Sequence, residues 1–90
     1  MDTRVAMISI VVENQEYVEK LNHILHEYGP YIIGRMGLPY PKRNISLISV
    51  TVDAPADKIS AMTGKIGMLK GITSKALYAR LQEEPGEKVD

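Results

Sequence analysis

Met7-Ile8-Ser9-Ile10, near the start of the chain, recurs with the same pattern as Leu47-Ile48-Ser49-Val50, at an offset of 40 residues. After each stretch, apolar residues follow at the spacing of three and four positions that is typical of a helix packed on one side. These residues are Val18, Leu21, Leu25 and Tyr28 in the first half and Ile59, Met62, Ile66 and Leu69 in the second, at an offset of 41. One inserted residue in the turn that enters the helix reconciles the two offsets. The chain is therefore predicted to contain two copies of one unit.

Each copy is predicted to run strand, helix, strand. Runs of β-branched and other apolar residues indicate the strands, and asparagine, proline and glycine mark the helix ends. The first copy has a strand at Arg4–Glu13, a helix that Asn14 can cap and that Gly29 and Pro30 stop, and a strand at Tyr31–Met36. The second copy has a strand at Ile45–Asp53, a helix that Asp53-Ala54-Pro55 opens and that Gly71 closes, and a strand at Ile72–Leu81.

Two βαβ units of this length predict an α+β fold, the ferredoxin-like βαββαβ plait, in which two helices cover one face of a four-stranded antiparallel sheet. Chance similarity between the halves is the alternative to duplication, and it leads to the same fold. Residues 1–81 are expected to form a single domain, because 90 residues suit one small domain. Residues 82–90 are polar and include Pro85 and Gly86, so we expect a flexible tail there.

The sheet face that the helices leave uncovered is expected to be unusually apolar. In the first strand one alternating set is Ala6, Ile8, Ile10 and Val12, and the other is Val5, Met7, Ser9 and Val11. In the third strand the two sets are Ile48, Val50 and Val52, and Ile45, Leu47, Ser49 and Thr51. Because a sheet that faces water alternates apolar with polar residues, we expect a homo-oligomer, a dimer or tetramer, that associates through this face or a sheet edge. The alternative is that Ser9, Ser49 and Thr51 keep this face hydrated, so that no subunit covers it.

The composition excludes several classes of partner and cofactor. Basic and acidic residues each number 11, so the net charge is zero, and nucleic acid, which needs clustered positive charge, is not an expected direct partner. The absence of cysteine excludes disulfides, a thiol nucleophile, thiolate zinc sites and cysteine-bound iron–sulfur clusters. No apolar run approaches the length of a membrane helix, and no signal-peptide pattern opens the chain. We therefore expect a cytoplasmic protein with no membrane contact and no cofactor.

The segment Tyr28–Tyr40 is the most distinctive, with three glycines, two prolines, three tyrosines and one arginine. Glycine permits unusual backbone paths, and an arginine can hold a carboxylate or phosphate. Charged and aromatic residues are expected to cluster at the turn between the second and third strands: Arg35, Tyr40, Lys42 and Arg43. The candidate effector-binding residues are Gly34, Arg35, Gly37 and Tyr40. The alternative is a hairpin with solvated charges, which we favour for Lys42 and Arg43 and leave open for Arg35.

A stripe on the first helix is a weaker candidate for a metal site. Glu19, His23 and His26 lie opposite the apolar face at spacings of three and four residues, and two histidines with one carboxylate are a possible ligand set. A subunit interface could complete such a site. The alternative, which we favour, is a solvated helix face, so no metal is expected.

Motifs of enzymes are missing, and we expect no catalytic activity. There is no serine–histidine–acid order with a nucleophile turn, no phosphate-binding P-loop and no HExxH zinc motif. Acylphosphatases share the plait but need an arginine in the first strand–helix turn, and Glu13–Glu16 contains none. RNA-recognition plaits carry aromatic residues on the two central strands, and neither Arg4–Val12 nor Ile45–Val52 has one.

From Val5 to about Tyr78 the chain resembles the small stand-alone proteins of the iron-only hydrogenase system regulator family. These are ACT-like proteins, similar in fold to the C-terminal domain of nickel-responsive repressors. The residues that carry the resemblance are Arg4-Val5-Ala6, Leu25-His26-Glu27-Tyr28-Gly29, Tyr31-Ile32-Ile33-Gly34-Arg35-Met36-Gly37, Pro39-Tyr40, Asp53-Ala54-Pro55 and Thr63-Gly64-Lys65. The Ile-Ile-Gly-Arg-Met-Gly segment is the most specific of them.

The resemblance implies a regulatory or sensory module that binds a small effector. ACT domains bind amino acids or other effectors at subunit interfaces, near the first strand–helix turn. Glu13–Glu16 departs from that pattern because it contains no glycine. The chain also lacks the cysteine and the DNA-binding segment of a nickel-responsive repressor. A purely structural oligomerisation module and a metal-responsive module that uses His23 and His26 remain the alternatives.

Overall fold

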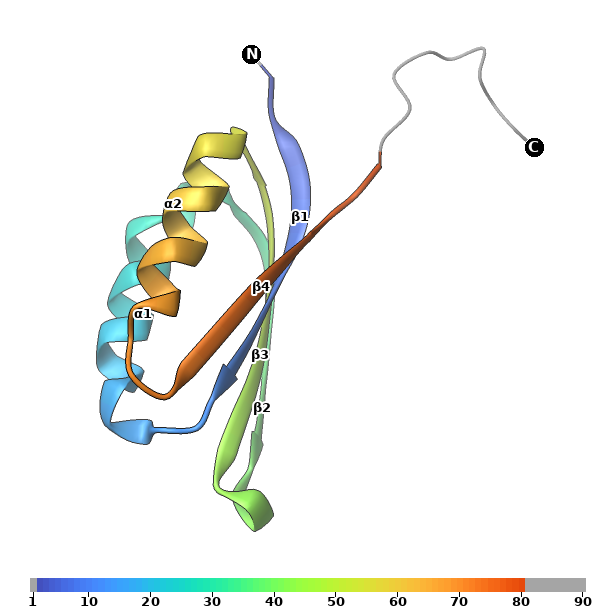
Figure 1. Cartoon of the computed structure of the whole chain (residues 1–90). Coiled ribbons are helices and arrows are strands. Elements are labelled where there is room, and N and C mark those ends of the chain that lie inside the picture. Colours follow the sequence, from blue (N-terminus) through green and yellow to red (C-terminus); the bar gives the residue numbers. More distant parts are fainter. Residues whose placement is uncertain (1, 81–90) are drawn as a thin grey trace, which may run out of the picture.

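Four strands form one antiparallel sheet in the order β2-β3-β1-β4, and both helices lie on the same face of it (Figure 1). This computed structural model describes residues 2–80. Its elements are β1 (Arg4–Val12), α1 (Val18–Glu27), β2 (Ile32–Tyr40), β3 (Ile45–Ala54), α2 (Ala56–Gly67) and β4 (Ile72–Tyr78). The element order and the two layers confirm the predicted α+β ferredoxin-like plait. Leu81 and the tail predicted at residues 82–90 lie outside the described residues.

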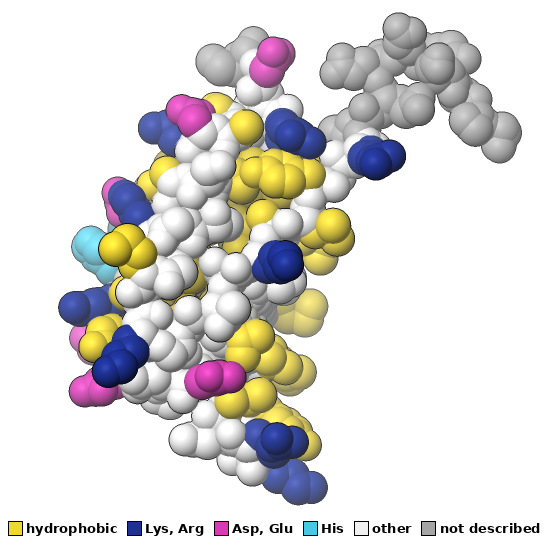
Figure 2. All heavy atoms as spheres, viewed as in Figure 1, with side chains coloured by type: hydrophobic (Ala, Val, Ile, Leu, Met, Phe, Trp, Pro, Cys, Tyr) yellow, Lys and Arg dark blue, Asp and Glu magenta, His cyan; other side chains and the backbone are white. Residues whose placement is uncertain are grey.

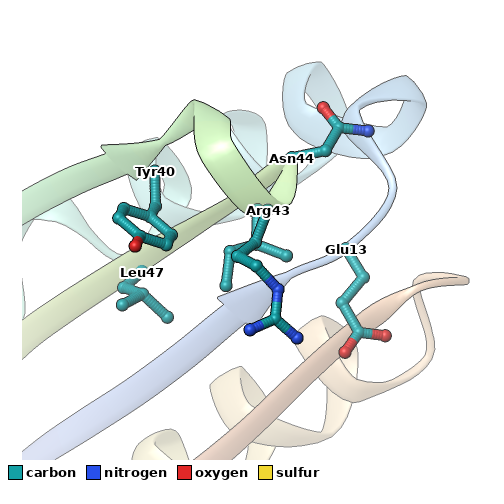
Figure 3. Close-up of a pocket in the computed structure, with 6 residues that line it drawn as sticks. Glu13, Tyr40, Arg43, Asn44 and Leu47 are labelled. Carbon is teal, nitrogen blue, oxygen red and sulfur yellow. The ribbon is translucent and has the colours of Figure 1, made fainter.

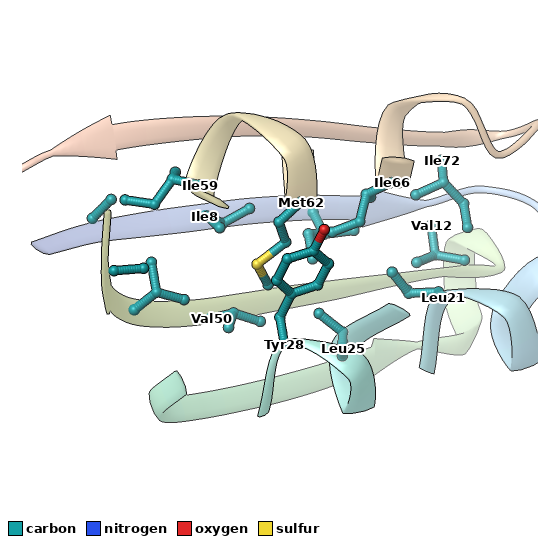
Figure 4. Close-up of a cluster of buried hydrophobic side chains, with 14 residues drawn as sticks. Ile8, Val12, Leu21, Leu25, Tyr28, Val50, Ile59, Met62, Ile66 and Ile72 are labelled. Atoms are coloured by element: carbon teal, nitrogen blue, oxygen red, sulfur yellow. The ribbon is translucent and has the colours of Figure 1, made fainter. Parts of the chain in front are cut away.

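The core fills the layer between the helices and the sheet. Every second residue of β1 from Ala6 to Val12 is buried, as the alternation predicts, and Val50 and Val52 of β3 lie beside them. The helices contribute the residues expected from their spacing: Leu21 and Leu25 from α1, and Ile59, Met62 and Ile66 from α2. Figure 4 shows these side chains pointing into one layer, with the ring of Tyr28 among them.

Two loops at one end of the sheet lie against each other. The amide of Glu13 donates a 2.7 Å hydrogen bond to the carbonyl of Gly71, and the Oδ1 of Asn14 accepts one from the amide of Glu16. Asn14 therefore caps the turn that enters α1, as predicted. The prediction that Gly71 closes the second helix is wrong, because α2 ends at Gly67. Gly71 instead turns the chain into β4 with a left-handed φ of 76°, which glycine adopts without strain.

The second strand is longer than predicted and contains the whole Gly34–Gly37 segment. β2 continues past Met36 to Tyr40, and the turn that follows is Pro41–Arg43, closed by Asn44 with a φ of 57°. Glycine and proline are tolerated here because β2 is an edge strand, which leaves every second amide outside the ladder. An irregularity between Ile32 and Gly34 shifts the register with β3 by one residue. This shift decides which side of the sheet each later residue of β2 faces.

The sheet face away from the helices, called the open face below, carries three complete rows of side chains across the strands in the order β2, β3, β1, β4. They are Gly34–Thr51–Met7–Leu77, Met36–Ser49–Ser9–Lys75 and Leu38–Leu47–Val11–Thr73. The two alternating sets predicted in the first strand and in the third strand lie on opposite faces of the sheet, as expected. Hydrophobic side chains gather along the side of the molecule away from the helices in Figure 2.

Candidate functional site

Six of the eight large hydrophobic side chains that residues 2–80 leave exposed lie on the open face. Leu77 and Met36 expose 72% and 67% of their surface, and Met7, Leu38 and Leu47 are exposed as well. Single exposed apolar residues are ordinary, but these share one continuous sheet face. A contiguous apolar face of this kind usually marks a contact surface.

One end of the open face holds a hollow of about 600 Å³ beside the turn between β2 and β3. Its lining comes from the end of β1, the turn and the start of β3: Glu13, Tyr40, Arg43, Asn44, Ile45 and Leu47. Figure 3 shows the side chains of Arg43 and Glu13 extending in the same direction, with Tyr40 and Leu47 to one side. The hollow therefore combines a cation, an anion and an apolar floor.

The charges in this hollow do not form an ion pair. Among residues 2–80 the contact between Lys65 Nζ and Glu27 Oε2, at 3.1 Å, is the only salt bridge. No hydrogen bond within this range engages the guanidinium of Arg43, so its donors can meet a ligand. A guanidinium presents paired N–H groups that match a carboxylate or phosphate.

The structure separates the four residues predicted to bind an effector. Arg35 pairs with Val50 and lies on the helix side, where its Nη2 donates a 3.1 Å hydrogen bond to Oδ1 of Asn22 in α1. Gly37 pairs with Ile48 on the same side. Gly34 and Tyr40 lie on the open face near opposite ends of β2, and only Tyr40 lines the hollow. The four residues therefore lie on two different faces of β2, two on each.

The hollow also contains residues that the sequence did not single out as ligands. Arg43 belonged to the expected turn cluster but was assigned to solvent, and Glu13 was noted only as part of an acidic turn. Continued alternation after the buried Val12 places Glu13 on the open side, and this was the available signal. What alternation could not reveal is that the turn after β2 brings Arg43 to the same place.

The stripe on α1 does not assemble a metal site within the described chain. Among residues 2–80 no three histidine, cysteine, aspartate or glutamate side chains lie close enough together to hold a metal ion. Glu19 and His23 border the same shallow hollow, with Lys20, Ile24 and Leu69, whereas His26 does not.

Within residues 2–80, neither helix has the length and continuous apolar character that a membrane crossing requires.

Comparison with known proteins supports one family. The family model described as "TM1266-like: Iron-only hydrogenase system regulator, putative" matches residues 4–76. The solved structure of the uncharacterized protein TM1266 from Thermotoga maritima superposes with a TM-score of 0.84 at 26% sequence identity, covering 88% of this chain and 100% of that one. No curated protein matches the chain. The match over residues 4–76 confirms the resemblance, and the chain therefore belongs to the TM1266-like family of iron-only hydrogenase system regulators.

Proposed function

We propose that this chain is a non-enzymatic regulatory module of an iron-only hydrogenase system, which associates through its open face and binds a small effector. The family description supports the regulatory role. The observation that carries the rest is the open face itself, on which Met7, Met36, Leu38 and Leu77 are exposed together. Removing apolar surface from water contributes roughly 25 cal/mol per Å², which opposes the loss of translational and rotational freedom on association.

The hollow beside the β2–β3 turn is the proposed effector site. The donors of Arg43 suit a carboxylate or phosphate, and the apolar walls from Ile45 and Leu47 suit a short hydrocarbon portion. Tyr40, one of the residues predicted from the sequence, contributes a ring and a hydroxyl to the same wall. Glu13 at the rim disfavours ligands with several negative charges, since like charges repel at short range. The chemical class is a small monoanion with an apolar part.

A thermal-shift screen against small carboxylates, phosphate monoesters, nucleotides and divalent metals tests this proposal. A ligand present at 100 times its dissociation constant adds about 2.7 kcal/mol of stability and raises the melting temperature measurably. We expect Arg43→Ala to abolish the shift, whereas Lys42→Ala should keep it, because Lys42 is the adjacent cation and does not line the hollow.

The alternatives give different results in the same screen. A shift that Arg35→Ala abolishes and Arg43→Ala preserves would move the effector to the helix side of β2. A shift caused only by nickel or zinc, and lost in His23→Ala, would favour the metal-responsive module. If no compound shifts a protein that light scattering shows to be oligomeric, the chain is a structural oligomerisation module.

A further inference from the structure

The three rows of the open face have a pattern that suits a second copy of the same face. The first row begins with Gly34 on one edge strand and ends with Leu77 on the other. A Cβ placed on Gly34 would meet nothing within 4 Å, so there is open space above it, whereas Leu77 is 72% exposed. In this row, therefore, no side chain protrudes at the β2 edge, whereas the Leu77 side chain protrudes at the β4 edge.

We propose, as a deepening of the association proposed above, that a second copy covers the open face about a two-fold axis parallel to the strands. Such an axis, passing between β1 and β3, exchanges β2 with β4 and β1 with β3. Each row then faces its own reversed copy. Leu77 of one copy lies over Gly34 of the other, and Leu47 lies over Val11. A two-fold interface requires this self-complementarity, because one patch meets itself.

The position of the one charged residue favours this axis over a two-fold axis that runs across the strands, along the middle row. Lys75 is the only charged residue in the three rows. With the axis parallel to the strands, Lys75 faces Met36 of the second copy, so its aliphatic stem packs on an apolar side chain while the ammonium reaches water at the sheet edge. An axis along the middle row would place Lys75 against Lys75, and like charges directly opposite each other are destabilising.

The size of the face agrees with a stable dimer. Four strands about 4.8 Å apart, with a rise of about 3.3 Å per residue, give a flat area of roughly 600 Å². The corrugation of the side chains raises the accessible area towards the ~800 Å² per partner that specific interfaces bury. Two sheets packed in this way keep their strands within about 30° of each other, which the parallel axis allows.

Engineered cysteines test the arrangement directly, since the chain has none of its own. The variant Gly34→Cys with Leu77→Cys places its thiols on opposite edge strands, roughly 14 Å apart within one copy, too far for an internal disulfide. In the proposed dimer each thiol faces the other thiol of the second copy. Because two packed sheets lie about 10 Å apart, which is too far for a direct disulfide, a short bis-maleimide is the suitable reagent. It should convert the protein to a covalent dimer on a denaturing gel.

The matched control is Gly34→Cys with Leu38→Cys, two positions on the same face of β2. These thiols are roughly 13 Å apart along the strand and do not face each other in the proposed dimer, but they do face each other under the alternative axis. We expect no covalent dimer from this control. The variant Leu38→Cys with Thr73→Cys, which pairs the ends of the third row, should cross-link as well and provides a second test if the first variant fails to fold.

Light scattering of the unmodified protein separates this inference from the proposal on which it rests. A monomer at micromolar concentration would overturn both the association and its geometry. An oligomer whose control variant cross-links, or in which neither facing pair does, would overturn the arrangement alone and leave the association standing.

Discussion

Replacing Gly71 by alanine should destabilise the fold more than any other glycine-to-alanine change in the described chain. Gly71 has a φ of 76°, in the left-handed region, and it is the only glycine of residues 2–80 with a positive φ. A Cβ at this position would overlap with the Cβ of Asn14 and lie 3.3 Å from its amide nitrogen. The substitution therefore meets a backbone strain and a steric obstacle together.

The expected loss is about 2–5 kcal/mol in the free energy of unfolding. An L-residue in the left-handed region costs roughly 1–2 kcal/mol. Overpacking against a neighbour typically costs ~1–3 kcal/mol, and here the neighbour includes backbone atoms of Asn14, which cannot rotate away. If the loop at Gly71 moved away from Asn14 to relieve the overlap, it would weaken the hydrogen bond between the Glu13 amide and the Gly71 carbonyl.

Urea unfolding followed by circular dichroism measures this loss, at one fixed protein concentration because association adds stability. Gly64→Ala is the matched control, since Gly64 lies in α2 with nothing within 4 Å of an added Cβ, and it should gain about 0.5–1 kcal/mol. Adding Asn14→Gly to Gly71→Ala removes the closest atom, the Cβ of Asn14, but leaves its backbone atoms and the strain, and it gives up the cap on Glu16. The double variant should therefore recover only part of the ~1–3 kcal/mol overpacking cost. A Gly71→Ala loss below about 0.5 kcal/mol, or no recovery in the double variant, would refute the reasoning.

Three further predictions concern the core, Arg35 and Lys65. Ile8 is fully buried, so Ile8→Ala should cost about 2–5 kcal/mol in urea unfolding, whereas Met68→Ala, at an 85% exposed position, should stay within about 0.5 kcal/mol; equal losses would contradict the assigned core. Arg35→Ala should lower stability by about 1 kcal/mol or less, because it removes one exposed hydrogen bond to Asn22. Asn22→Ala should cost a similar amount, and additive losses in the double variant would show that the two side chains act independently. The Tyr28 side chain first, and the Glu27 carboxylate second, raise the pKa of Lys65 above its ordinary value of 10.5. The stability from this contact is therefore present below pH 10.5 and lost as the pH rises through the higher folded-state pKa. The stability difference between the unmodified protein and Lys65→Met should shrink above pH 10.5, while Lys65→Arg, which stays charged, should not lose its contribution there; a difference that is constant with pH would contradict this assignment.

The core was predictable because the signals that encode it are local. Alternation in β1 identified Ala6, Ile8, Ile10 and Val12 as the buried set, and all four are buried. Helical spacing identified Leu21, Leu25, Ile59, Met62 and Ile66 in the same way. Each of these patterns depends only on the period of one element, which a strand or helix imposes on its own sequence.

The extent of β2 was less accessible to sequence reasoning. Gly34, Gly37 and Pro39 resemble turn residues, yet they lie within a strand because the ladder with β3 supplies hydrogen bonds on one side only. Local propensity does not show that a strand lies at an edge, since that depends on the order in which the strands assemble. The tertiary pairing therefore overrode the turn signals.

The sequence by itself determined the plait and the buried faces of both helices, β1 and β3, because duplication and periodicity are properties of the chain itself. It also indicated the family, through the residues that carry the resemblance. Only the tertiary structure decided where the functional candidates lie. The one-residue shift near Ile32 turned Arg35 towards α1 and Tyr40 towards the open face, since a slip of one residue moves every later side chain to the other side. Glu13 and Arg43 line the same hollow, and Asn14 lies against Gly71, although these residues are distant in sequence. No local sequence pattern predicts such long-range proximity, because it arises only once the sheet has formed.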